Sequence, residues 1–204
     1  MKLLYQSLSA RTSRVTECLQ KPPDLIRLLC FLTLAGVAAG AVFGDCLPPD
    51  TALLTQGLAV TDRLRTLWDA YLAALLPHLL LLAGVRLSGS SACGQPAAAA
   101  LLLLRGAAVG SCAADCMRSA GGFLRAAVCV LPMGFLSSVI LVYAAADALR
   151  LSGRLGGYLL LGGTDPEIRE TFHRTSVHML VYLLLSLAAA GVHTALLWAA
   201  SARL

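Results

Sequence analysis

Five long, continuous apolar runs constrain this chain more than any other feature of its sequence. About 20 apolar residues are enough for a helix to cross a bilayer. A transmembrane β-strand would instead alternate apolar and polar residues over about ten positions. With 58% hydrophobic residues, 13% charged residues and a mean hydropathy of +0.77, the chain lacks the polar surface of a soluble domain. We therefore predict an all-α, polytopic helical membrane protein in which residues 1–204 form a single integral membrane domain.

The apolar runs predict five transmembrane helices separated by polar segments. The spans cover residues about 26–44, 69–86, 96–116, 123–146 and 176–199. Pro77 and Pro132 fall inside the second and fourth spans, where a helical bundle tolerates the kink that a proline causes. Residues 51–68 repeat leucines at near-helical spacing, which predicts an amphipathic helix on the outer membrane surface. Thr164 and Glu167 form a capping-box pattern that predicts a surface helix before the fifth span.

Basic residues predict how the chain is oriented in the membrane. If residues 1–27 lie inside the cell, the inner segments hold twice as many Lys and Arg residues as the outer ones. The positive-inside rule then predicts a cytoplasmic N-terminus, a C-terminus outside and a location in the cell membrane. The net charge of +5 fits this explanation better than nucleic-acid binding, because no basic stretch is interleaved with aromatic residues. The expected partner of the helices is the lipid bilayer, with no nucleic acid.

Glycines recur every fourth residue in two of the predicted spans. Gly36, Gly40 and Gly44 lie at the end of the first span, and Gly106 and Gly110 lie in the third. Glycines on one helical face allow another backbone to approach closely. The pattern predicts packing within the bundle or against the helix of a partner.

Arg105 is the most informative single residue, because it lies near the middle of an otherwise apolar span. A charge at that depth costs about 2.5–3.5 kcal/mol on insertion scales. The side chain could pair inside the bundle, lie nearer an interface, or serve a substrate path, a proton relay or a partner. Candidate mates are Asp115, Asp147 and carbonyls freed by Pro77 or Pro132, although Asp115 is about 15 Å away along the same helix.

No set of residues in the sequence predicts catalysis, a metal or a cofactor. His78 and His193 lie within apolar spans, where a buried, hydrogen-bonded neutral imidazole is the simpler interpretation. Cys112 and Cys116 share a helical face, which favours small-residue packing over a metal site or redox pair. The metalloprotease, serine-hydrolase and phosphate-loop motifs do not occur. We therefore expect a protein that is not an enzyme.

The third and fourth spans carry residues that resemble a known family. Gly94-x-Pro96, then Arg105-Gly106 and Gly110, followed by Leu131-Pro132 and Ala148-Leu149-Arg150, match its sequence pattern. This pattern resembles that of the stage II sporulation protein M family, which also has a similar size, five spans and a basic cytoplasmic N-terminus. The resemblance covers most of the chain.

What the resemblance implies is a non-catalytic membrane scaffold. Proteins of that family anchor two peptidoglycan hydrolases, a lytic transglycosylase and an amidase, during engulfment of the forespore in sporulation. The residues expected to pack helices or bind partners are Gly36, Gly40, Gly44, Gly94, Pro96, Arg105, Gly106, Gly110 and Pro132. The alternative is a small transporter or permease subunit, suggested by Arg105, His78 and the proline-interrupted spans. An intramembrane enzyme is a third hypothesis, for which the sequence contains no set of catalytic residues.

Overall fold

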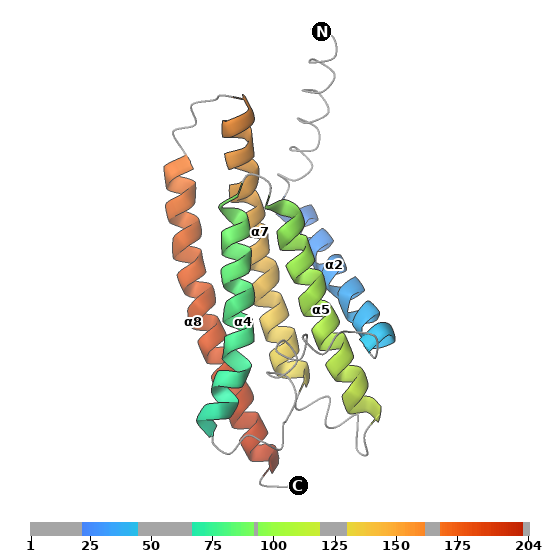
Figure 1. Ribbon diagram of the computed structural model, residues 1–204. Helices are drawn as coiled ribbons and strands as arrows, with labels where there is room; N and C mark the ends of the chain where they lie inside the picture. Colours follow the sequence, from blue (N-terminus) through green and yellow to red (C-terminus); the bar gives the residue numbers. More distant parts are fainter. Residues whose placement is uncertain (1–21, 45–66, 92–93, 119–129, 162–167, 202–204) are drawn as a thin grey trace.

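The computed structural model describes residues 22–44, 67–91, 94–118, 130–161 and 168–201 (Figure 1). All of the elements in these ranges are helices: α2 (Pro22–Phe43), α4 (Leu67–Gly89), α5 (Gln95–Arg118), α7 (Leu131–Leu161) and α8 (Ile168–Ser201). Each of the five contains a segment long and apolar enough to span a membrane. The predicted fold class, an all-α protein with five membrane-spanning helices, is confirmed. The amphipathic helix predicted at residues 51–68 and the capping box at Thr164 lie almost entirely outside the described residues.

The helices run alternately up and down and lie side by side in one bundle (Figure 1). Helix α7 is central, because it contacts each of the other four. Helix α2 packs chiefly against α5, although α4 is the next described helix along the chain. Helices that cross a membrane one after another along a chain alternate in direction in this way.

The buried apolar side chains form two clusters along the bundle. One joins α2, α4, α5 and α7 through residues such as Leu29, Val85 and Leu141. The other joins α4, α5, α7 and α8 and includes Leu75 and Met133. Conversely, large apolar side chains on the outside, including Phe31, Leu34, Leu180, Leu184 and Trp198, remain exposed. An apolar exterior of this kind is compatible with contact with a lipid bilayer.

A tight turn joins α4 to α5 and depends on a glycine. The Gly94 amide donates to the Ser91 carbonyl at 3.2 Å, and the Gly94 carbonyl accepts from the Ala98 amide at 3.0 Å in the first turn of α5. A Cβ at residue 94 would lie 2.9 Å from the Cα of Ser88. The close return of the chain therefore requires the absence of a side chain at Gly94.

Two helix boundaries differ from those predicted. Helix α7 continues to Leu161, beyond the predicted end at residue 146, and α8 begins at Ile168 rather than residue 176. The sequence predicted a polar segment between the spans, yet Asp147, Arg150 and Arg154 bond within α7 or to α8 and are compatible with a continued helix. Residues 123–129 of the predicted fourth span lie outside the described ranges.

The two span prolines occupy different positions. Pro77 lies inside α4, as predicted, and the helix continues through it. Pro132 is the second residue of α7, and residues 119–129 before it lie outside the described ranges, so its predicted place in the interior of a span stays a prediction. In the first turn of a helix the backbone N–H has no intrahelical acceptor, so a proline costs little there.

Candidate functional site

The contact between α2 and α5 brings two backbones together through glycines from both helices. A Cβ at Gly36 would lie 2.6 Å from the Leu103 carbonyl oxygen and 3.2 Å from the Cα of Gly106. A Cβ at Gly40 would overlap the Ala107 backbone more severely. Since backbone atoms cannot move aside as a side chain can, these positions have no room for larger residues.

The same contact continues toward the other end of the two helices. A Cβ at Gly110 would meet the Val37 carbonyl and lie 2.9 Å from the Ala41 amide nitrogen. Gly44 is less tightly placed, because its Cβ would meet the Ser111 side chain at 3.0 Å. The structure thus places Gly36, Gly40, Gly44, Gly106 and Gly110, the predicted packing residues of both spans, in a contact inside the bundle.

Arg105 lies inside the bundle with 2% of its surface exposed. Its Nη2 donates to the Ser137 Oγ on α7, and the Ser137 hydroxyl in turn donates to the Gly134 carbonyl at 3.3 Å. The Nε of Arg105 is buried and has no hydrogen-bond partner among the described residues. A buried donor without a partner costs about 1–3 kcal/mol, and more when it is charged.

Neither of the carboxylates proposed as mates of Arg105 pairs with it. Asp115 pairs instead with Arg118 at 3.9 Å on an exposed surface, and Asp147 binds residues of α7 and α8. A separation of ten residues explains both cases, between Asp115 and Arg105 along α5 and between Asp147 and Ser137 along α7. The recorded hydrogen-bond partner of Arg105, the Ser137 hydroxyl, was not among the candidates considered from the sequence.

His78 on α4 is also fully enclosed, with 1% of its surface exposed. The expectation that it is buried is confirmed, but the expected hydrogen bond is absent, because neither ring nitrogen has a partner in the described part of the chain. Leu82, one turn from His78, packs in the same cluster as Leu102, one turn from Arg105, so the two polar residues lie at a similar level of the bundle. His193 on α8 is likewise buried, as predicted.

The two cysteines of α5 are both free thiols. Cys112 packs in the second apolar cluster beside residues such as Met133 and Val130. Within the described ranges, no group of three His, Cys, Asp or Glu side chains is arranged to hold a metal ion.

A polar network joins α7 to the first half of α8. The Oδ2 of Asp147 accepts a hydrogen bond from the Tyr182 hydroxyl at 2.9 Å and lies 2.8 Å from the Nδ1 of His178. Its other oxygen pairs with Arg150 at 3.5 Å, one helical turn along α7. The network holds α7 and α8 together just beyond the predicted end of the fourth span.

Arg86, near the end of α4, extends this cross-linking to a third helix. Its Nη2 donates to the Ser176 Oγ at 2.9 Å, and its guanidinium carbon lies 4.6 Å from the centre of the Phe172 ring. A guanidinium over an aromatic face is attracted by the electron-rich ring. Arg154 of α7 donates to the Thr171 hydroxyl at 2.6 Å, near the beginning of α8.

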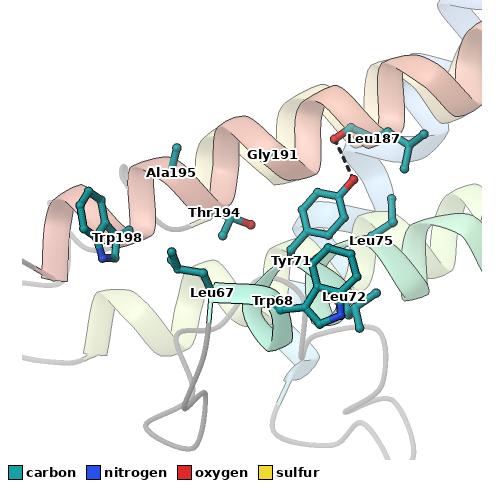
Figure 2. Close-up of a pocket in the computed structure, with 10 residues that line it drawn as sticks. All are labelled: Leu67, Trp68, Tyr71, Leu72, Leu75, Leu187, Gly191, Thr194, Ala195 and Trp198. Carbon is teal, nitrogen blue, oxygen red and sulfur yellow. Dashed lines mark hydrogen bonds between the residues drawn. The ribbon is translucent and has the colours of Figure 1, made fainter.

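An apolar groove of about 700 Å³ lies between the beginning of α4 and the end of α8 (Figure 2). It is lined by Leu67, Trp68, Tyr71, Leu72, Leu75, Leu187, Gly191, Thr194, Ala195 and Trp198. The Tyr71 hydroxyl donates to the Leu187 carbonyl at 3.4 Å across it, and Trp68 stacks on Tyr71 with ring centres 5.7 Å apart. Its lining gives a solute few polar groups to recognise, and such aromatic side chains are typical of the membrane–water boundary.

Comparison with known proteins adds no relative. No protein-family model, no curated protein and no solved structure gives a significant match to this chain.

Proposed function

We propose that the protein is a non-catalytic membrane scaffold, and that the partners it recruits are cell-wall hydrolases. The observation that carries the proposal is the position of the glycines that belong to the family pattern. Gly94 closes the turn before α5, while Gly106 and Gly110 seat α5 against the backbone of α2. Residues that fix helices at backbone contact support a structural role rather than a chemical one.

The finer assignment rests on the resemblance to the stage II sporulation protein M family. It names a lytic transglycosylase and an amidase as partners and engulfment during sporulation as the process. The positions of Gly94 just before α5, and of Arg105, Gly106 and Gly110 within it, support the architecture that the resemblance implies. Pro96 stands in the first turn of α5, where proline is well tolerated, and Pro132 does the same in α7.

The distribution of charge supports an orientation with the N-terminus in the cytoplasm and the C-terminus outside. Arg86, Arg150, Arg154 and Arg174 lie toward the end of the bundle at which α4 and α7 finish and α8 begins. The described residues near the opposite end include Asp69, Asp115 and Arg118. By the positive-inside rule, the arginine-rich end faces the cytoplasm and hydrolases would be recruited at the other end.

The test is recovery of the partners from native membranes. Tagged protein is purified in mild detergent with its own organism's candidate wall hydrolases co-expressed. We expect a hydrolase to be recovered with the wild type and with Arg27→Gln, a change at an exposed residue near the start of α2 and away from the proposed recruiting end. We expect recovery to fall with Gly40→Leu, which breaks the α2–α5 contact. Recovery of the protein alone at several detergent strengths contradicts the scaffold proposal.

A small transporter or permease subunit is the second candidate, favoured by one observation. Arg105 carries a charge inside the bundle and has no carboxylate partner among the described residues. Buried ionisable residues in membrane helices often mark the path of a substrate or ion. Flux of a solute or ion into proteoliposomes, dependent on Arg105 and independent of any partner protein, would favour this candidate over the scaffold.

A further inference from the structure

Three helices place buried polar side chains at the same level of the bundle, each within about one turn of Leu82, Leu102 or Leu141, which pack in one apolar cluster. His78 comes from α4, Arg105 from α5 and Ser137 from α7, and each has at most 2% of its surface exposed. We use the name inner cluster for these three residues. Ser137 is held in turn by the Gly134 carbonyl, so the cluster has a defined backbone anchor on α7.

The hydrogen bonds of the inner cluster are incomplete, and the incomplete atoms are nitrogens. They are the Nε of Arg105 and both ring nitrogens of His78. A guanidinium has only donors, and an imidazole has at least one. The cluster therefore presents buried N–H groups and a positive charge, while the hydroxyl of Ser137 is already engaged with Arg105 and Gly134.

The described carboxylates do not balance this charge. Asp147 is held by His178 and Tyr182, and Asp115 faces Arg118. Buried charges in proteins are almost always paired. N–H donors gathered around an uncompensated positive charge, away from water, are the chemistry that recognises an anion.

We propose that the inner cluster binds a small monovalent anion of the halide type. The anion accepts hydrogen bonds from the Nε of Arg105 and from an N–H of His78, and its charge compensates the guanidinium. Ser137 is a positioning residue, because it fixes the Nη2 of Arg105 and so directs the Nε toward the anion. This site is independent of the scaffold role, because a scaffold could hold such an anion permanently as part of its structure.

The first experiment measures thermal unfolding of the full-length protein in detergent at constant ionic strength, in sodium chloride or in sodium gluconate. Gluconate is too large to enter a buried site. A ligand that binds the folded state raises its stability by mass action. With chloride at tenfold excess over its dissociation constant, we expect a midpoint about 3 °C or more above that in gluconate. Equal midpoints in the two salts overturn the proposal and leave ordered water as the partner of these nitrogens.

Variants test whether the inner cluster is the site. Arg105→Gln and His78→Leu should remove most of the difference between the two salts, while Arg118→Gln should retain it. If Arg105→Gln does not fold, Ser137→Ala provides the second test, with at least a tenfold weaker response to chloride. Equilibrium binding of radioactive chloride to the wild type should show a single site that Ser137→Ala weakens. Retention of the full chloride effect in either inner-cluster variant overturns the proposal.

Flux separates a resident anion from a transported one. Proteoliposomes loaded with radioactive chloride are compared with empty liposomes. Binding without flux supports the anion site together with the scaffold role. Binding with flux that Arg105→Gln abolishes supports the anion site but favours the transporter. The scaffold proposal can therefore fail while the anion site stands, and the reverse also holds.

Discussion

The same substitution should change the stability of the bundle far more at a glycine in backbone contact than at a glycine in open space. Gly40 faces the Ala107 backbone, whereas a Cβ at Gly191 would meet nothing within 4 Å. Gly40→Leu should destabilise the bundle by about 1–3 kcal/mol or more, because neither backbone can yield. Gly191→Leu, at the apolar groove, should leave stability nearly unchanged. Unfolding midpoints of the two purified variants provide the measurement, and equal losses would contradict the α2–α5 contact.

The bond between Arg105 and Ser137 makes a second prediction at the residue scale. Ser137→Ala leaves the Nη2 of Arg105 without this acceptor and should cost about 1–3 kcal/mol. Adding Arg105→Met removes the buried charge itself, and a charge replaced by an apolar side chain is often neutral or stabilising. The double variant should therefore be more stable than Ser137→Ala alone, as judged by denaturant unfolding. A double variant less stable than the single one would count against this pairing.

Some of these residues could be singled out from the sequence alone, and others could not. A lone arginine in an apolar run is conspicuous, so Arg105 could be singled out before its surroundings were known. Its partner could not, because serines are common in apolar helices and Ser137 has no periodic or motif signal. Asp147 was a reasonable candidate by charge, but which helix faces it depends on the packing of α8 against α7. Spatial pairing across helices is set by the bundle and not by local sequence.

At the scale of elements, the extended end of α7 depends on the network around Asp147. Asp147→Ala removes the acceptor of Tyr182 and the partner of His178, which should cost about 1–2 kcal/mol. The effect should be local, loosening the first turns of α8 before the rest of the bundle. Hydrogen exchange followed by mass spectrometry should show faster exchange near residues 168–178 than at the centre of α4. Uniformly faster exchange would show that the network is not local.

The two prolines provide a contrast between elements. Pro132→Ala should change stability by no more than about 0.5 kcal/mol, because Pro132 is the second residue of α7 and proline is well tolerated in the first turn of a helix. Pro77→Ala gives α4 an additional backbone donor in its interior and so should have the larger effect, of either sign. Thermal midpoints of the two variants test this ordering. Both prolines were predicted inside spans; the structure confirms this for Pro77, whereas the residues preceding Val130 lie outside the described ranges.

For the whole molecule, the five apolar runs were sufficient to predict the number and type of spans. Hydrophobic length identifies a spanning helix without reference to its neighbours. It does not say where a helix ends when the polar residues beyond it bond to a neighbouring helix. That is why α7 and α8 are both longer than predicted, whereas the start of α5 was predicted to within a residue.

The orientation proposed from the charges gives a prediction for the whole molecule. Alkaline phosphatase fused after Leu204 should be active, because the enzyme folds only outside the cytoplasm, whereas a fusion within the turn at Ser91 should be inactive. Green fluorescent protein at the same two sites should give the opposite result. A reversal of both patterns would place the arginine-rich end outside.

The pairing of α2 with α5 has a consequence for how the protein is made. Helix α2 enters the membrane first, yet its glycine face meets its main partner only after α4 and the turn at Gly94 have followed. Throughout that interval lipid, an insertion factor or another chain must cover the face. Biosynthesis is therefore the stage at which this bundle is most open to mispairing, and substitutions in α5 should be felt first as failed membrane integration of α2.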